Sequence, residues 1–590
     1  MIRLPKLYQR FLVYLSIFGL IVFLYYDHNQ TSRVQDYRIS EGLKKEFDAD
    51  AEEWLQDNGL EHLSPSDNLL INIGNEQCFH IGRFYERCFS FYELRPQPKS
   101  VHLLVARRKI HKDLKGSFGR KWLGRSEYLY YDILRLSSLH SLGSDFGELN
   151  VDAITGISSG SKDNSVSFKD FSVTFEPISI ELLQKRGIIS EINILFGTDC
   201  VDPRETWSLQ KDVSFTHYAG SEPAYLTYRF AGFYPANSKA QRLQETDEGR
   251  FKIVQLADLH LGVGESECVD EFPKHETCKA DPKTEAFVQQ VLDIEAPQLV
   301  VFTGDQIMGD RSIQDSETAL LKAVAPVISR GIPWAMVWGN HDDEGSLTRW
   351  QLSELVSTLP YSLFQFSTYD TKDNTFGVGN YVHQVFSYNN TEVPVSTLYF
   401  LDSHKYSTVG KIYPGYDWIK ESQWEYMNKY YDETLELKTE LSMAFFHIPL
   451  PEYLNIQSST HPGEENALVG TYKEGVTAPK YNSEGMATLH KLGVDVVSCG
   501  HDHCNDYCLQ DDSTPSQIWL CYGGGGGEGG YAGYGGTERR IRIYEINISE
   551  NNIYTWKRLN GSPKEIFDYQ SMLNNNDYQS MLNNNSPKTV

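Results

Sequence analysis

The residues best suited to chemistry fall into five short groups, and each group directly follows an apolar run of six or seven residues. The runs are residues 251–257, 297–303, 333–338, 441–446 and 494–499. In the same order, the groups are Asp258-Leu259-His260, Gly304-Asp305, Gly339-Asn340-His341-Asp342, His447 and Gly500-His501-Asp502-His503. One such group alone is usually an ordinary turn or a core histidine. Five in this order, each behind an apolar run, indicate a single site.

The residue types in these groups are typical of a metal centre. Carboxylate, imidazole and amide oxygen suit borderline divalent ions such as Zn, Mn or Fe, and thiolate does not dominate the set. If Asp305 bridges two ions, three further groups remain for each ion, with open positions for water. Alternate side chains of an extended segment share a face, as Asp258 and His260 would, or His501 and His503. The sequence therefore predicts a site for two divalent metal ions (Fe, Mn or Zn).

The elements that position this site are those of an α/β domain. The apolar runs alternate with segments of helical periodicity, such as residues 282–298 and 315–331. In such a sheet, loops at the carboxyl ends of the strands converge, so the five groups are expected to meet at that edge. Polar residues 237–250 mark a boundary, and we expect the domain to span residues 250–548.

The order D-x-H, G-D, G-N-H-D, H, G-H-x-H resembles that of the calcineurin-like metallophosphoesterases, from about residue 250 to residue 545. This resemblance implies a β-sandwich flanked by helices and metal-dependent hydrolysis of phosphoesters. For the first metal it implies the ligands Asp258, His260, Asp305 and His503, and for the second the ligands Asp305, Asn340, His447 and His501. His341 is then expected to protonate the leaving oxygen or stabilise its charge, and Asp342 to orient His341.

Residues 264–284, followed by 302–310, resemble the purple-acid-phosphatase-like branch of this family. Purple enzymes carry a tyrosine three residues after the bridging aspartate, where this chain has Met308. Without a phenolate ligand, we expect neither the purple colour nor a ferric first metal.

The layout of the whole chain resembles a member of the family linked to cell-cycle regulation, which implies a phosphomonoesterase acting on phosphoproteins. Two alternatives stay open. The site could act on a phosphodiester, a nucleotide or a lipid headgroup. The chain could also be a membrane-tethered interaction protein with a vestigial catalytic domain.

The formal net charge of -25 argues against a nucleic-acid partner, because phosphate contacts need clustered Lys and Arg, which the chain lacks. It also gives an anionic substrate no long-range attraction. Any phosphate binding therefore needs a locally positive centre such as bound metal. The sequence predicts no particular oligomeric state.

The amino terminus predicts a membrane anchor. Basic residues precede the uncharged run 11–26, so residues 1–26 are expected to form a cytosolic stub and a signal anchor. A cleaved signal peptide and a buried helix are the alternatives. Because the basic side stays cytosolic, the catalytic domain is expected in a lumen or outside the cell, with a cytosolic domain as the alternative. That orientation predicts glycosylation at Asn29, Asn389 and Asn547, and more weakly at Asn560.

The remaining segments have simpler interpretations. Residues 27–66 are expected to form a stalk, 67–240 a β-rich accessory domain, and 562–590 a disordered tail with a tandem repeat of DYQSMLNNN. Residues 522–536, rich in glycine, are interpreted as a flexible surface linker, with a loop at the pocket rim as the alternative. Cys268 and Cys278 are the best candidates for a disulfide.

Overall fold

The computed structural model describes residues 50–573, apart from residues 82–84, 94–104, 116–122, 141–150, 160–164, 169–170, 216–220, 235–241, 367–375, 459–467, 512, 516 and 534. The chain divides into two compact units. One holds Met1–Leu195 and Thr206–Tyr234, the other Phe196–Glu205 and Pro235–Val590. The predicted anchor, residues 1–26, lies outside the described residues. Within the described part, no helix has the length and apolar character needed to cross a membrane.

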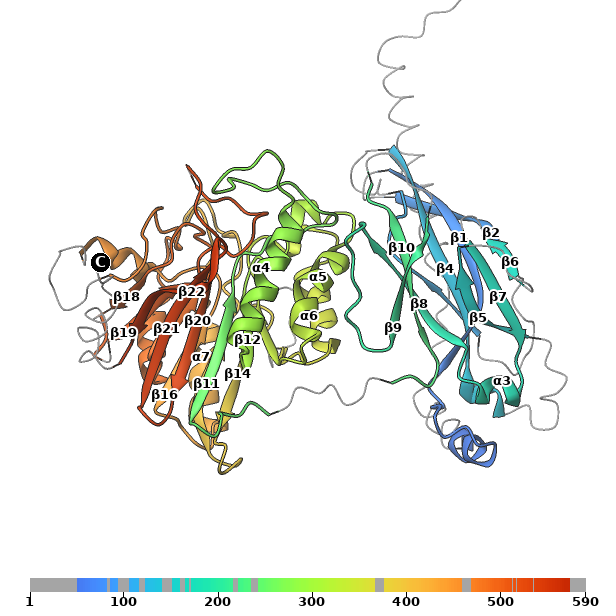
Figure 1. Ribbon diagram of the computed structural model, residues 1–590, viewed down its shortest axis with the longest axis horizontal. Helices are drawn as coiled ribbons and strands as arrows, with labels where there is room; N and C mark the ends of the chain where they lie inside the picture. Colours follow the sequence, from blue (N-terminus) through green and yellow to red (C-terminus); the bar gives the residue numbers. More distant parts are fainter. Residues whose placement is uncertain are drawn as a thin grey trace, which may run out of the picture. The chain divides into compact units, whose positions relative to one another are not determined.

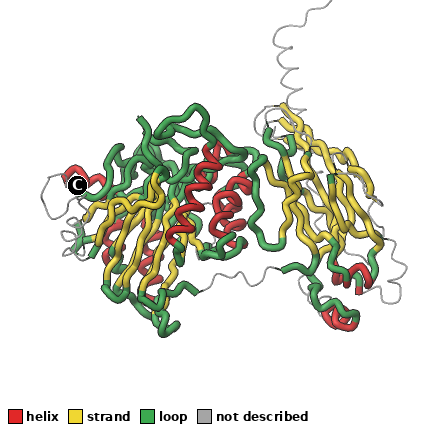
Figure 2. Tube along the Cα trace, in the orientation of Figure 1, coloured by secondary structure: helices red, strands yellow, loops and turns green. Residues whose placement is uncertain are grey.

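The first unit is β-rich, as the sequence predicts for residues 67–240 (Figures 1 and 2). Its four-stranded sheet has the order β2-β1-β4-β3, and two three-stranded sheets have the orders β5-β7-β6 and β8-β10-β9. The strands are β1 (Asn68–Ile81), β2 (Tyr85–Glu93), β3 (Val105–Lys109), β4 (Leu123–Arg135), β5 (Asp152–Ser158), β6 (Ser165–Phe168), β7 (Phe171–Pro177), β8 (Ile189–Phe196), β9 (Trp207–Ser214) and β10 (Ala224–Phe230). A short helix, α3 (Ile180–Gln184), lies between β7 and β8.

The expected stalk over residues 27–66 differs from the structure in its second half. Residues 50–57 form a helix, and Leu55, Leu60 and Leu63 are buried in one cluster with Leu69 and Leu134. The apolar residues whose spacing indicated a helix pack into the core of the first unit. Residues 50–66 are therefore part of that unit.

The second unit is a sandwich of two six-stranded sheets. The first sheet has the order β13-β12-β11-β20-β21-β22, with β11, β12 and β13 parallel. The second has the order β14-β15-β16-β17-β19-β18, with β15, β16, β17 and β19 parallel. The strands are β11 (Arg250–Leu256), β12 (Leu299–Thr303), β13 (Trp334–Val337), β14 (Tyr381–Phe386), β15 (Pro394–Phe400), β16 (Leu441–Phe445), β17 (Val496–Cys499), β18 (Cys508–Asp511), β19 (Ile518–Tyr522), β20 (Arg540–Asn547), β21 (Asn552–Leu559) and β22 (Ser562–Ser571).

The two sheets pack face to face through central strands. The Tyr544 hydroxyl donates to Ser498 Oγ at 2.8 Å, and the rings of Tyr544 and Phe445 lie 6.4 Å apart. Gln255 of β11 donates to the Cys499 carbonyl at 3.1 Å. These contacts hold the carboxyl ends of β11 and β17 at one edge of the sandwich.

Helices flank the sandwich, so the predicted α/β fold is confirmed. Helix α4 (Ala280–Glu295) packs on β11 and β22, and α5 (Ser316–Ile328) lies between α4 and α6 (Arg349–Thr358) (Figure 1). Helices α7 (Glu421–Lys429) and α8 (Gly485–Lys491) pack together. Their Trp424 and Leu489 are buried in one core with Ala444 of β16.

The prediction of a disordered tail over residues 562–590 is wrong for residues 562–571. Ser562–Ser571 form β22, which pairs antiparallel with β21 and extends the sheet past the expected boundary at residue 548. The repeat begins inside this strand. Met572 is buried, and its carbonyl accepts the Trp519 indole N–H at 2.5 Å. Composition indicated disorder, but pairing with β21 and burial of Met572 order this segment.

Replacing Asp495 with asparagine should stabilise the second unit at alkaline pH. Asp495 accepts the Ser442 N–H at 2.9 Å, and burial raises its pKa from 3.8 to about 6. Because the folded-state pKa exceeds the unfolded one, the stability contribution of Asp495 is complete below pH 4 and lost as pH rises through 6. We expect Asp495→Asn to raise the free energy of unfolding by about 2–3 kcal/mol at pH 8.

The measurement is denaturant unfolding of both proteins at pH 4 and pH 8. The gain should vanish at pH 4, and the exposed Asp247→Asn should show no gain at either pH. An equal gain at both pH values would rule out titration of Asp495 as the cause.

Candidate metal centre

All five groups lie at the carboxyl ends of parallel strands of the sandwich. Asp258 and His260 follow β11, Asp305 follows β12, and Asn340 follows β13 in the first sheet. His447 follows β16, and His501 and His503 follow β17 in the second sheet. Asp258, His260, Asp305 and His501 all have positive φ, between 49° and 81°. The chain thus turns sharply at four of these positions, where the side chains leave the strand ends and converge.

The first group joins Asp258, His260 and His503, whose ligand atoms lie within 4.8 Å of one another. His260 Nε2 lies 3.0 Å from His503 Nε2, and His503 Nε2 lies 3.3 Å from Asp258 Oδ1. All three side chains are buried. This group coincides with the ligands expected for the first metal.

The second group joins Asp305, His447 and His501, again with ligand atoms within 4.8 Å. His447 Nε2 lies 3.2 Å from His501 Nδ1 and 3.2 Å from Asn340 Oδ1. Asp305 Oδ2 lies 3.3 Å from His447 Nε2 and 3.9 Å from His260 Nε2. Asp305 therefore reaches both groups, as a bridging carboxylate must.

Hydrogen bonds outside the cluster orient two of the imidazoles. His447 Nδ1 is 2.9 Å from the Thr303 carbonyl, and His503 Nδ1 is 2.8 Å from the Tyr531 carbonyl. A carbonyl only accepts, so both Nδ1 atoms carry hydrogen, and in the neutral imidazoles both Nε2 atoms direct lone pairs inward. The His503 Nε2 lone pair then faces Asp258 Oδ1 at 3.3 Å, and two facing acceptors repel unless a cation lies between them. The donor set and its orientation fit divalent metal ions.

Electrostatics keep two of the imidazoles neutral, the form that binds a metal. Burial, and then His503, lower the pKa of His260 well below its usual value, and burial with His447 does the same for His501. Both imidazoles are thus neutral. At His447, burial lowers the pKa, but Asp305 outweighs burial and raises the pKa to about 9. Burial raises the pKa of Asp305, but His447 outweighs it and holds that pKa well below the usual range.

His341 differs from the other histidines because it is partly open to solvent. Its side chain is 32% exposed, and its ring centroid lies 5.6 Å from that of His260. Its backbone N–H donates to Asp305 Oδ1 at 2.8 Å. Burial lowers the pKa of His341, but Asp305 and then Glu344 outweigh it and raise the pKa overall.

The expected role of Asp342 in orienting His341 is corrected. The His341 Nδ1 partner is Glu344, 2.7 Å away. Asp342 is fully buried and accepts backbone N–H groups of Gly339, Asp305 and Ile307 at 2.7, 3.0 and 3.2 Å. Asp342 therefore ties the loop after β12 to the loop after β13, and it positions Asp305 instead. Burial and Asp305 raise the pKa of Asp342 to about 7.

The interpretation of residues 522–536 as a flexible surface linker is also corrected. Residues 523–530 are buried, and the N–H groups of Gly525, Gly526 and Gly527 donate to the carbonyls of His503, Ala257 and Asp258. A Cβ on Gly527 would lie 1.8 Å from the Leu259 carbonyl oxygen. Glycine is needed here because the backbone packs directly on the segments that carry the metal-site residues. The run of glycines in the sequence indicated close backbone packing, but it did not indicate which segments the glycines pack against.

Gly530→Ala should weaken the first metal group. A Cβ there would lie 2.6 Å from His260 Cδ2 and 2.6 Å from His503 Cε1, so the two rings must move apart. Overpacking of this kind costs about 1–3 kcal/mol. We expect a lower melting temperature and less than one ion bound at the first group, measured by metal analysis after dialysis.

Gly475→Ala is the matched control, because nothing lies within 4 Å of a Cβ at that position. Wild-type metal content in Gly530→Ala would show that the glycine segment does not position these rings.

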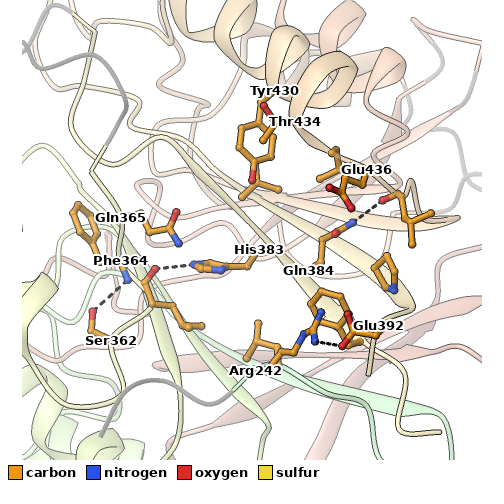
Figure 3. Close-up of a pocket in the computed structure, with 17 residues that line it drawn as sticks. Arg242, Ser362, Phe364, Gln365, His383, Gln384, Glu392, Tyr430, Thr434 and Glu436 are labelled. Atoms are coloured by element: carbon orange, nitrogen blue, oxygen red, sulfur yellow. Dashed lines mark hydrogen bonds and ion pairs between the residues drawn. The ribbon is translucent and has the colours of Figure 1, made fainter. Parts of the chain in front are cut away.

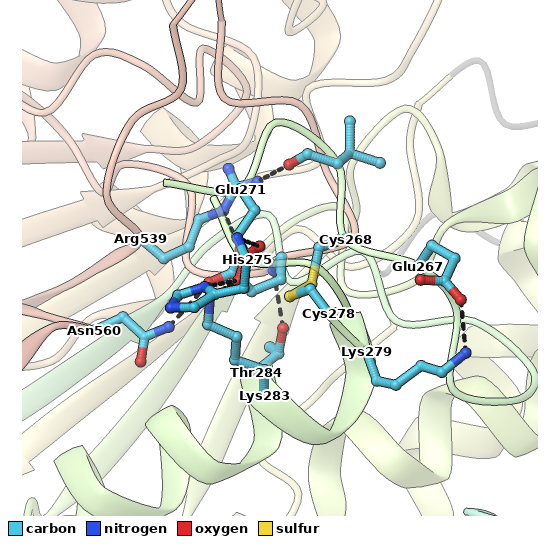
Figure 4. Close-up of a disulfide and its surroundings, with 12 residues drawn as sticks. Glu267, Cys268, Glu271, His275, Cys278, Lys279, Lys283, Thr284, Arg539 and Asn560 are labelled. Atoms are coloured by element: carbon cyan, nitrogen blue, oxygen red, sulfur yellow. Dashed lines mark hydrogen bonds and ion pairs between the residues drawn. A yellow bond between two sulfur atoms is a disulfide. The ribbon is translucent and has the colours of Figure 1, made fainter. Parts of the chain in front are cut away.

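The loop after His260 is secured by the predicted disulfide. Cys268 and Cys278 are bonded, and Figure 4 shows the ion pairs around them. Glu271 contacts His275 and Lys283, each at 2.8 Å, and Lys283 also pairs with Glu528 of the glycine segment at 2.9 Å. The loop and the glycine segment are thus joined beside the first metal group. Cys78–Cys88 and Cys508–Cys521 form two further disulfides, which the sequence did not predict.

A separate cavity of about 600 Å³ lies along the edge strand β14. Figure 3 shows His383 and Gln384 among its lining side chains, with His383 Nε2 2.7 Å from the Leu363 carbonyl. The lining contains none of the predicted ligands. We therefore place the chemistry at the strand ends and not in this cavity.

Comparisons of the sequence with known proteins identify the family of this chain. A family model described as calcineurin-like phosphoesterase matches residues 251–505. Phosphatase DCR2 of Saccharomyces cerevisiae is 71% identical over 576 residues, covering 98% of this chain and 99% of that protein. A protein of Arabidopsis thaliana named "Probable inactive purple acid phosphatase 29" is 35% identical over 368 residues, covering 58% of this chain and 90% of that protein. Purple acid phosphatase PPD1 of yellow lupin (Lupinus luteus) aligns at 10% identity, covering 89% of this chain and 75% of that chain, with a TM-score of 0.35.

The fold and the site define a phosphoesterase of the two-metal class. The chain belongs to the calcineurin-like phosphoesterase family, with relatives among purple acid phosphatases, and it is a metal-dependent phosphatase. The resemblance inferred from the five motifs is thereby confirmed.

Proposed function

We propose that this phosphatase is a phosphomonoesterase that acts on phosphoproteins. Seven residues would hold two ions: Asp258, His260 and His503 one, Asn340, His447 and His501 the other, and Asp305 both. The observation that carries this assignment is the pair of inward-facing nitrogens, His447 Nε2 and His503 Nε2, each fixed by an Nδ1 hydrogen bond to a carbonyl. The layout of the whole chain resembles that of a family member linked to cell-cycle regulation. This resemblance supports a phosphoprotein substrate and a role in the cell cycle.

When bound, the two ions supply Lewis-acid activation of water and neutralise charge on the phosphoryl oxygens. The side chains of the chain supply the rest. Asp305 keeps the two groups together, and Asp342 fixes the Asp305 backbone. His341, held by Glu344 and open to solvent, donates a proton to the leaving oxygen. The positive charge of the bound ions would also let this acidic chain bind an anionic substrate.

The test uses the purified full-length chain, loaded with Mn²⁺, Zn²⁺ or Fe²⁺. Phosphate release is compared for a phosphopeptide, p-nitrophenyl phosphate and bis(p-nitrophenyl) phosphate. We expect the two monoesters to be hydrolysed at least about tenfold faster than the diester, which corresponds to about 1.4 kcal/mol. Preference for the diester would favour a phosphodiesterase. No turnover by a chain that binds two ions would contradict the proposal.

We also propose that residues 1–26 anchor the chain with its catalytic domain in a lumen or outside the cell. The uncharged run behind basic residues supports the anchor. The three disulfides support an oxidising compartment, since such bonds persist there and are rare in the cytosol.

Glycan mapping tests this orientation, and the structure changes which site is informative. Asn389 lies exposed between β14 and β15, whereas Asn547 of β20 is 5% exposed and accepts the Glu550 N–H at 3.1 Å. A glycan on Asn547 would not fit the folded chain, because that side chain is buried. We therefore expect a glycosidase-sensitive mass at Asn389 that Asn389→Gln removes. An unmodified Asn389 in membrane-bound chains would contradict the orientation.

A further inference from the structure

A loop after β15 places two tyrosines beside the second metal group. Residues 405–417 fold back on themselves, because Ser407 N–H donates to the Gly415 carbonyl at 2.9 Å and Asp417 N–H to the Lys405 carbonyl at 2.8 Å. Tyr406 and Tyr416 face each other across this loop as a β-bridge. Their rings stack, with centroids 5.5 Å apart and an interplanar angle of 23°.

The base of this loop is fixed to the metal-site loops. Buried Arg349 donates to Asp402 Oδ1 and to the Gly339 carbonyl, each at 2.5 Å, and to the His404 carbonyl at 3.4 Å. Lys405 adds an ion pair with Asp343 at 2.8 Å. The residues before Tyr406 are therefore joined to the Gly339-Asn340-His341-Asp342 segment, so the tyrosines are held in place relative to that segment.

Both tyrosines contact groups of the proposed site. The Tyr416 ring meets the His501 ring edge to face, with centroids 4.3 Å apart. Tyr406 lies near the side chains of Asn340 and Glu344, and burial and then Glu344 raise its pKa. Since Glu344 also holds His341, Tyr406 lies on the side of the site where the leaving group must meet its proton donor.

Tyr406 is nevertheless not covered by the protein. It is 45% exposed, and the same loop exposes Val409 and 72% of Ile412. An aromatic ring that is stacked on one neighbour and still nearly half exposed offers a preformed apolar surface. Aromatic pairing on such a surface contributes about 0.5–1.5 kcal/mol beyond area burial.

We propose that Tyr406, supported by Tyr416, is the leaving-group subsite of this phosphatase and selects aryl phosphomonoesters such as phosphotyrosine in a peptide. This inference rests on the proposed monoesterase function. Tyr406 is a specificity residue here, because it binds the group attached to the phosphate. The apolar side chains of Val409 and Ile412 would extend the surface for residues next to phosphotyrosine.

The test measures binding, so it does not require turnover. Phenylphosphonate and methylphosphonate are titrated calorimetrically into the full-length, metal-loaded chain. We expect phenylphosphonate to bind about 2–10-fold more tightly, the factor that corresponds to 0.5–1.5 kcal/mol. Tyr406→Ala should bring this ratio close to one, and Tyr406→Phe should keep it.

Tyr388→Ala is the control, because exposed Tyr388 precedes the opposite end of β15, a strand about 20 Å long. Equal affinities for the two phosphonates in the wild type, or an unchanged ratio in Tyr406→Ala, would overturn the subsite. If neither phosphonate binds to the wild-type chain, the proposed metal site itself is refuted.

Turnover measurements then distinguish phosphotyrosine in a peptide from a small aryl phosphate as the substrate. The ratio of kcat/KM for a phosphotyrosine peptide to that for the same peptide with phosphoserine should exceed one and fall in Tyr406→Ala. If only p-nitrophenyl phosphate shows the effect, the subsite serves small aryl phosphates and the peptide form of the proposal is wrong.

Discussion

Asp305→Asn should lower kcat/KM by about a thousandfold and reduce the bound metal from two ions to at most one. Asp305 Oδ2 lies 3.3 Å from His447 Nε2 and 3.9 Å from His260 Nε2, so one carboxylate serves both groups. Asparagine keeps the size and the acceptor for the His341 N–H, but removes the charge and one ligand oxygen. Losing charge stabilisation of several kcal/mol in the transition state gives this magnitude.

The effect is measured by steady-state kinetics together with metal analysis of the same sample. Asp310→Asn is the matched control, because Asp310 lies five residues further along and is exposed. An Asp305→Asn protein that keeps two ions and near-normal turnover would show that Asp305 does not bridge them.

His341→Ala should lower kcat by about 10²–10⁴-fold on a phosphoserine peptide and much less on p-nitrophenyl phosphate. An alkoxide leaving group needs a proton in the transition state, whereas p-nitrophenolate is stable without one. The metal content should not change, because the His341 side chain is 32% exposed and belongs to neither buried group. Glu344→Gln should have a smaller effect of about tenfold, since it weakens one charge-assisted hydrogen bond.

His275→Ala is the control for His341, as His275 is an exposed histidine that also pairs with a glutamate. An equal loss on both substrates would argue against proton donation, because a general acid matters most for the poorer leaving group. Loss of metal in His341→Ala would make His341 part of the metal site instead.

The convergence of the candidate ligands could be predicted because each of their five groups follows its own strand. Local pattern alone marks the ends of β11, β12, β13, β16 and β17, and parallel pairing brings those ends to one edge within each sheet. The packing of the two sheets then brings the two edges together. The Cys268–Cys278 disulfide could be predicted because its cysteines bracket a polar loop beside the first group, whereas Cys78–Cys88, with the same sequence separation of 10, has no such setting. The α/β sandwich and the β-rich first unit follow from the same periodicity.

What the sequence did not reveal depends on contacts between segments far apart in the chain. Gly530 packs against His260, 270 residues earlier, and nothing near the glycine run indicates that partner. Tyr416 lies 85 residues before His501, which its ring contacts. Asp342 follows His341 directly but turns into the core, because its carboxylate has three backbone donors there. Burial likewise removes Asn547 from the candidate glycan sites.

Metal content at saturation tests the central claim most directly. The full-length chain is incubated with excess Mn²⁺ or Zn²⁺, freed of unbound ions, and measured by mass spectrometry of the native protein. We predict two ions per wild-type chain and at most one in Asp305→Asn. A wild-type chain that holds fewer than one ion under these conditions would contradict the two-metal site.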